Sequence, residues 1–285
     1  MRSEPVDGFR LTYDRAGSGP PVVLLHGWPG DRTDYRHVVQ LLTDHATVVV
    51  PDLRGFGESD RRADAPADAY AAAAQAESLA ALIEELGLDR PVVVGYDVGS
   101  RAAQTLARQR PDLLAALIVG PPLPGVGRRV LEENTVREFW YQHFHRSSLI
   151  EELIDGRPDA VRTYLAYIWG HWSGPAYTPA EADLDHLVEV YGAPGAFTAS
   201  VAWYRSGSGT VARSLAEVTP EPVDRLQVPT TVLWPEHDPL FPREWSDRLS
   251  EFLADFRLRP VDGIGHFLPL EAPALLAEEI VAELR

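Results

Sequence analysis

Several residue types are absent or scarce in this 285-residue sequence, and each absence narrows the functions that it can have. The chain has no Cys, which excludes disulfide frameworks, thiolate zinc sites and thiol nucleophiles. It also has no Lys: the 26 basic residues are all Arg, against 42 Asp and Glu, and the formal net charge is -16. A surface this acidic repels phosphate backbones and anionic lipids, so we expect neither nucleic acid nor a membrane as a partner.

Long apolar runs are missing as well. No stretch approaches the ~18 apolar residues needed to span a bilayer, and residues 1–17 contain no apolar signal-peptide core or cleavage pattern. A cytoplasmic protein is therefore the expectation. The mean hydropathy of -0.16 is that of an ordinary globular chain, and the length suits one large domain with a substantial insertion.

Short runs of Val, Leu and Ile alternate with helical patterns over the first 120 residues. The runs at 22–25, 47–50, 92–94 and 114–119 predict buried strands, and the segment 70–86 between them predicts a helix. The pattern resumes with strands at 229–234 and near 256–260 and a helix over 273–284. Strand and helix alternation of this kind predicts an α/β fold with a mainly parallel sheet covered by helices.

The intervening segment differs, because it is rich in Trp and Tyr and its patterns are helical. One helix is expected over 179–191, with Thr178 and Glu181 as a capping box at its start. We therefore predict a core domain formed by residues 1–121 and 220–285, and a helical cap domain formed by residues 122–219.

The sequence Gly-Tyr-Asp-Val-Gly at 95–99 lies where a predicted strand meets a predicted helix. Small residues around a central side chain at such a junction are typical of a nucleophile elbow, a sharp turn that holds the side chain above the strand end. The pentapeptide alone fits equally well a glycine-rich turn in which Asp97 caps the next helix. Further motifs follow other strands in order: His-Gly-Trp-Pro-Gly at 26–30, Pro-Asp-Leu-Arg-Gly-Phe-Gly-Glu-Ser-Asp at 51–60, Asp238, and Gly-His-Phe at 265–267.

With these motifs in this order, the sequence resembles the α/β-hydrolase fold. Within it, the resemblance is to the branch with an Asp nucleophile, which contains epoxide hydrolases and haloalkane or haloacid dehalogenases. The resemblance covers essentially the whole chain and implies a mostly parallel eight-stranded sheet with an inserted helical cap. It implies Asp97 as nucleophile, Asp238 as relay acid and His266 as base. Glu236 is the alternative acid, because it lies only two residues before Asp238.

The resemblance also places the oxyanion hole at the backbone N–H groups of Trp28 and Val98, whereas His26 in the same turn is expected to be structural. A carboxylate nucleophile suits displacement at an sp³ carbon, which leaves an alkyl ester on Asp97. His266, oriented by Asp238, would then activate the water that hydrolyses this ester. No metal or organic cofactor is implied.

The identity of the leaving group depends on donors from the cap. Tyr204, in Ala-Trp-Tyr-Arg at 202–205, resembles the tyrosine with which epoxide hydrolases bind the epoxide oxygen. The resemblance implies a second donor four residues before the aromatic Phe144, which is Trp140 in this sequence, with Tyr141 as the alternative. Trp28, Tyr141 and Trp203 are expected to contact the substrate. The other interpretation of these aromatic residues is that they only pack the cap on the core.

These observations favour an epoxide hydrolase that converts a small neutral hydrophobic epoxide to a vicinal diol. A dehalogenase acting in the same two steps is the alternative, although Val98 stands where haloalkane dehalogenases have Trp and fluoroacetate dehalogenases have Arg. Arg101, one helical turn further on, is the only trace of a carboxylate clamp. A hydrolase fold that binds a small molecule without catalysis is a third hypothesis. Whether the chain forms a homodimer stays open.

Overall fold

The strands arise from runs of Val, Leu and Ile, whose side chains pack well on a pleated surface. The structure is a computed structural model that describes residues 1–284. Within these residues, seven strands form one sheet in the order β1-β3-β2-β4-β5-β6-β7. They are β1 (Tyr13–Gly17), β2 (Pro21–Leu25), β3 (Thr47–Pro51), β4 (Val92–Gly95), β5 (Ala116–Val119), β6 (Thr230–Pro235) and β7 (Phe256–Val261).

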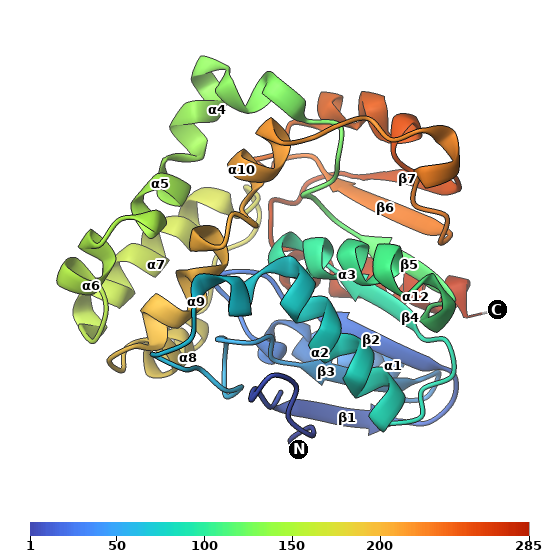
Figure 1. Ribbon diagram of the computed structural model, residues 1–285, viewed down its shortest axis with the longest axis horizontal. Coiled ribbons are helices and arrows are strands. Elements are labelled where there is room, and N and C mark those ends of the chain that lie inside the picture. The colour runs from blue at the N-terminus through green and yellow to red at the C-terminus, as the bar shows by residue number, and fades with distance from the viewer. Residues whose placement is uncertain (285) are drawn as a thin grey trace.

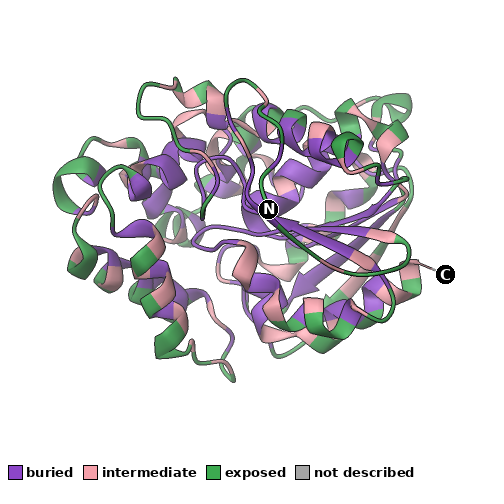
Figure 2. Ribbon diagram, turned by 90° about the horizontal axis from the view of Figure 1, so that it is seen from below, coloured by how far each residue is buried: buried purple, intermediate pink, exposed green. Residues whose placement is uncertain are grey.

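The sheet is parallel except at one edge, where β1 pairs antiparallel with β3. Strands β2, β4, β5 and β6 are buried over nearly their whole length, as the purple strands at the centre of Figure 2 show. The carboxyl ends of parallel strands meet at one edge of the sheet, which is where α/β proteins bind ligands. The motifs after β2, β4 and β6 therefore come together at this edge.

Helices cover both faces of the sheet. α2 (Ala72–Glu85) packs on α3 (Asp97–Gln109) in front of the sheet in Figure 1, and α12 (Pro273–Glu283) lies behind it, packed on α1 (Arg36–Leu42). The short helix α11 (Leu268–Glu271) precedes α12. None of the helices in residues 1–284 is long and apolar enough to cross a membrane.

Seven further helices separate β5 from β6 in the chain. They gather on the left and at the top of Figure 1, beyond the carboxyl edge of the sheet. They are α4 (Glu133–Glu138), α5 (Trp140–Arg146), α6 (Leu149–Leu153), α7 (Pro158–Trp172), α8 (Glu181–Tyr191), α9 (Ala196–Arg205) and α10 (Thr210–Leu215). The division into domains at residues 122 and 219 stays a prediction.

The α/β fold predicted from the sequence is confirmed, with three differences in detail. The sheet of the described chain has seven strands where eight were expected, because residues 1–12 form only isolated bridges such as Arg2 with Thr12. β1 was not predicted, since this edge strand has a polar sequence. The expected capping box is also wrong: Ala180 is the N-cap of α8, and no side chain caps that helix.

Candidate active site

Asp97 lies at the sharp turn between β4 and α3. Its φ of 48° is in the left-handed region, which Asp and Asn enter more easily than other residues with a side chain. The backbone N–H of Asp97 donates to the carbonyl of Pro121 at 2.9 Å, which ties the turn to the end of β5. A Cβ atom added to Gly95 would lie 2.5 Å from the carbonyl oxygen of Gly99. A Cβ atom added to Gly99 would collide with the carbonyl oxygen of Leu25, at the end of β2. Glycine is thus required at 95 for the tight turn and at 99 for the close approach of α3 to β2.

The turn after β2 lies against Asp97. A Cβ on Gly27 would come within 2.7 Å of the Cβ of Asp97, so only glycine allows this approach. The backbone N–H of Trp28 donates to Oδ1 of Asp97 at 2.7 Å. Val98 is buried at the start of α3 and, together with Asp97, borders a small cavity. The first oxyanion-hole candidate therefore already contacts the carboxylate, and the second lies beside it.

His266 and Asp238 complete the group. Nδ1 of His266 is 2.8 Å from Oδ2 of Asp238, and Nε2 of His266 is 3.5 Å from Oδ2 of Asp97. This buried Nε2 has no hydrogen-bond partner. Oδ1 of Asp238 accepts from the backbone N–H of Leu240 at 2.9 Å, which fixes the carboxylate. Three residues that are 28 or more positions apart in sequence thus meet at the carboxyl edge of the sheet.

The charges around His266 set its protonation state. Burial alone would lower the pKa of His266, but the Asp238 carboxylate, through its charge and its hydrogen bond, and the nearby Asp97 raise that pKa to about 10. At neutral pH the imidazole is therefore protonated and lies between two carboxylates. Loss of the negative charge on Asp97 would remove part of this stabilisation.

Glu236, the alternative relay acid, lies away from this group. Its side chain is 43% exposed, and it accepts a hydrogen bond from the backbone N–H of Gly263 at 2.8 Å. Asp238 therefore occupies the position from which a carboxylate can orient His266, and Glu236 holds a surface turn.

The cavity above Asp97 is very small, with a volume of about 10 Å³, which is room for roughly one water molecule. Core and inserted segments both line it: Asp97, Val98, Pro122, Tyr141, Gln142, Trp203, Tyr204, Ser208 and Thr210. The expected substrate-contacting residues Tyr141 and Trp203 are thus among its walls. Trp28 is fully buried beneath them, with its ring stacked parallel to that of Tyr141.

Two tyrosines from the inserted helices face each other at this cavity. The rings of Tyr141 on α5 and Tyr204 on α9 meet edge to face, with their centroids 5.7 Å apart. Burial, assisted by the negative charge of Asp97, raises the pKa of both hydroxyls well above the ordinary value. Both therefore stay protonated and can donate a hydrogen bond.

The structure does not bring Trp140 to this cavity. Trp140 is 40% exposed and packs against Phe144 and Tyr167 on the outer side of α5. Successive residues of an α-helix point about 100° apart, so Trp140 and Tyr141 cannot both face the core. This placement corrects the choice of Trp140 as the second donor, because the alternative residue, Tyr141, occupies the inner face.

Sequence reasoning missed Gln142. Its Nε2 donates to the hydroxyl of Tyr141 at 3.0 Å, and its Oε1 accepts from the backbone N–H of Val211 at 3.1 Å. Gln142 thereby fixes the Tyr141 hydroxyl as a hydrogen-bond acceptor and leaves the hydroxyl proton free. A Gln directly after an aromatic residue is the only signal that the sequence offered.

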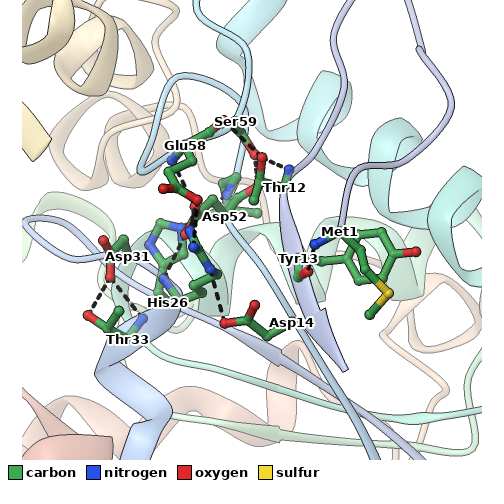
Figure 3. Close-up of polar contacts among 12 residues, drawn as sticks. Met1, Thr12, Tyr13, Asp14, His26, Asp31, Thr33, Asp52, Glu58 and Ser59 are labelled. Atoms are coloured by element: carbon green, nitrogen blue, oxygen red, sulfur yellow. Dashed lines mark hydrogen bonds and ion pairs between the residues drawn. The ribbon is translucent and has the colours of Figure 1, made fainter. Parts of the chain in front are cut away.

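His26 bonds only to backbone groups, as expected for a structural residue. Its Nε2 accepts from the N–H of Leu53 at 3.0 Å, and its Nδ1 is 2.8 Å from the carbonyl oxygen of Gly27. Behind it, the buried carboxylate of Asp52 accepts from the backbone N–H groups of Arg32 and Glu58, each at 2.8 Å (Figure 3). This network joins residues 26–32 to residues 52–59 and holds the Trp28 turn in place.

Comparison with known proteins identifies the family of this chain. The family model for the alpha/beta hydrolase fold matches residues 20–273. The chain belongs to the α/β-hydrolase family. Residues 1–284 contain no cluster of His, Asp and Glu side chains arranged to hold a metal ion.

The relatives of this α/β hydrolase include proteins with two different activities. It is 27% identical to the soluble epoxide hydrolase of Corynebacterium sp. (strain C12), over 96% of this chain and 93% of that protein. It is 31% identical to a fluoroacetate dehalogenase of Burkholderia sp., over 68% of this chain and 64% of that protein. Among solved structures, the ligand-free epoxide hydrolase CorEH has a TM-score of 0.84 and 26% identity, with 100% of this chain and 99% of that chain covered. The α/β hydrolase is thus an epoxide hydrolase-like enzyme.

Proposed function

We propose that this hydrolase opens a small, neutral, hydrophobic epoxide to a vicinal diol through an ester on Asp97. The observation that carries the proposal is the setting of the Asp97 carboxylate. One of its oxygens accepts from the Trp28 N–H, and the other faces the unpartnered Nε2 of His266. The proposal includes a cap formed by residues 122–219, which supplies two tyrosine hydroxyls above this carboxylate.

In the first step, Oδ2 of Asp97 forms a bond to an epoxide carbon, and the carbon–oxygen bond of the ring breaks. The electron pair of that bond goes to the departing oxygen. The hydroxyls of Tyr141 and Tyr204 donate hydrogen bonds to this oxygen as negative charge develops on it, which lowers the barrier. An alkoxide needs such donors more than a halide does, because it is the stronger base.

Formation of the ester changes the state of His266. Asp97 is now neutral, so one of the two carboxylates that held the imidazole protonated is gone, and the pKa of His266 falls. The proton that His266 releases balances the one that the alkoxide takes up. Asp238 still raises the pKa of His266 in the ester, but without the charge of Asp97 the imidazole releases its proton more easily and can act as the base of the second step.

In the second step, neutral His266 removes a proton from a water molecule, whose oxygen attacks Cγ of Asp97. The N–H groups of Trp28 and Val98 stabilise the oxyanion that forms on Asp97. When the intermediate collapses, the bond from Cγ to the alkyl oxygen breaks, and the second water proton goes to this oxygen. The diol leaves, and Asp97 and His266 return to their charged states.

The fluoroacetate dehalogenase relative favours one second candidate, displacement of a halide by the same carboxylate. The cavity gives this candidate less support, since Val98 has no side-chain donor for a halide. The Tyr141 and Tyr204 hydroxyls can bind either leaving group. The substrate pair in the test below therefore shares one carbon skeleton.

The test uses the His266→Gln variant, which retains Asp97 and loses the base. After exposure to an aryl epoxide, we expect a stable adduct on the peptide that contains Asp97, detected by mass spectrometry, and no diol. The chloride analogue should give at most about a hundredth of this rate of adduct formation, because the developing alkoxide is the stronger base and gains more from the two tyrosine hydrogen bonds than a departing chloride does. Adduct on another residue, or faster reaction with the chloride, would contradict the proposal.

A further inference from the structure

A second cleft, outside the candidate active site, contains an unusual group of arginines. It lies between α3 of the core and the segment that carries α10, and it has a volume of about 420 Å³. Arg101 and Arg108 come from α3, and Arg213 comes from α10. None of the residues that line this cleft also lines the cavity above Asp97. The cleft is therefore a separate feature of the surface.

These three guanidinium groups have no partner. Within residues 1–284, no hydrogen bond or ion pair joins the side chain of Arg101, Arg108 or Arg213 to a protein acceptor. Nε of Arg101 is also buried without an acceptor. The chain has 42 carboxylates for 26 arginines, so a shortage of acceptors does not explain this arrangement. A buried unpartnered donor is costly and points to an acceptor that binds there.

Glu217 is the one carboxylate among the residues that line the cleft, and it is engaged elsewhere. Its Oε2 accepts from the backbone N–H of Gly125 at 2.7 Å, and its Oε1 is 3.9 Å from Nη1 of Arg248. Burial, and then the positive charge of Arg213, lower the pKa of Arg101 to about 10, although Glu217 opposes this change. The arginines are thus close enough to repel one another.

We propose that this cleft binds a small molecule that carries a phosphate or carboxylate group. Guanidinium forks bind such oxyanions through pairs of parallel hydrogen bonds. The buried hydroxyl of Ser214 and the amide of Gln109 at the margin add neutral donors. The volume lies in the range of small-molecule sites and leaves room for several atoms beyond the anionic group.

Because the cleft lies between two segments of the chain, a bound ligand would hold these segments together. Arg101 and Arg108 belong to the helix that begins at Asp97, whereas Arg213 belongs to the segment inserted after β5. An anion that contacts all three removes their mutual repulsion and ties α10 to α3. We therefore expect ligand binding to stabilise the folded chain.

The test measures binding of two probes, inorganic phosphate and succinate, by titration calorimetry and thermal unfolding at an ionic strength kept constant with sodium chloride. We expect a saturable heat and a rise in Tm with at least one probe, and the tighter probe identifies the anionic group. Arg108→Gln and Arg213→Gln should each weaken binding by about tenfold or more, the usual effect of losing a charge-assisted pair. Both side chains are exposed, so these variants should fold.

Arg110→Gln is the matched control. It removes the same charge at the end of the same helix, but Arg110 pairs with Asp112 and Glu84 and does not line the cleft. Its affinity for the probe should equal that of the unmodified chain. The proposal is overturned if neither probe binds more tightly than chloride, or if Arg110→Gln weakens binding as much as Arg213→Gln does. Either result leaves the reaction proposed for Asp97 untouched, because the two sites share no residue.

Discussion

Replacing Tyr141 with Phe tests the proposed donors most directly, because a matched control lies next to it in the chain. The substitution removes one hydroxyl from the cavity above Asp97 and leaves the ring in place. Loss of one well-placed donor to developing charge costs about 2.7–4 kcal/mol in the transition state, or roughly 10²–10³ in rate. Trp140→Phe changes a side chain that is 40% exposed and outside the cavity, and should leave the rate within about a factor of two.

The structure also predicts a stability cost for Tyr141→Phe. The variant leaves Nε2 of the buried Gln142 without its acceptor, which costs about 1–3 kcal/mol of unfolding free energy. No buried amide depends on the Tyr204 hydroxyl, whose neighbour is the hydroxyl of Tyr141, so Tyr204→Phe should lose rate with a smaller loss of stability. Stopped-flow measurement of ester formation, together with urea unfolding of each variant, separates the two effects. If Trp140→Phe slows ester formation as much as Tyr141→Phe does, the assignment of the inner face of α5 is wrong.

Three further predictions concern the charged groups. Asp97→Asn and Asp97→Ala should both abolish turnover. The Ala variant should lower the unfolding free energy by about 1 kcal/mol more than the Asn variant, because Asn tolerates the left-handed backbone at this position. Equal stabilities of the two variants in urea unfolding would contradict this. Asp238→Asn should reduce kcat by a factor of up to about 10⁴, whereas Glu236→Gln should retain nearly full activity in steady-state assays. A larger loss of activity in Glu236→Gln than in Asp238→Asn would mean that Glu236 is the relay acid. Because the pKa of His266 is raised to about 10 in the folded chain, protonation of His266 contributes stability that is fully present below about pH 6.5 and is lost as the pH rises towards 10. The stability advantage of the unmodified chain over His266→Gln should therefore shrink across that window. A difference in urea unfolding that stays constant with pH would refute this.

The sequence was most informative where one local pattern decides the structure. Buried strands such as β4 are continuous runs of Val, and the glycines on either side of Asp97 mark the turn that the backbone makes there. The sequence was less informative where contacts between several elements determine the structure. β1 is a polar edge strand that forms only because β3 offers its free edge. Counting residues from Phe144 could not show which side of α5 faces the core, so Trp140 was chosen before Tyr141.

Unpaired charges are likewise invisible in a sequence. In the sequence, Arg101 was only a trace of a carboxylate clamp, and the fold is what brings Arg213 of α10 into the same cleft. Pairing of charges depends on contacts between distant segments, and no spacing along the chain reports it. The same holds for Gln142, whose importance rests on its contact with the Tyr141 hydroxyl.

The unequal surroundings of the two Asp97 oxygens have a consequence for where each oxygen atom ends up. In the proposed reaction, the oxygen that faces His266 leaves in the diol, and an oxygen from water replaces it, while the Trp28 N–H holds the other in place. In ¹⁸O-labelled water, the first diol molecule should therefore carry an ordinary oxygen taken from the protein. The label should enter Asp97 and reach the product in the second cycle. In each cycle, Asp97 thus gives one carboxylate oxygen to the product and regains one from water.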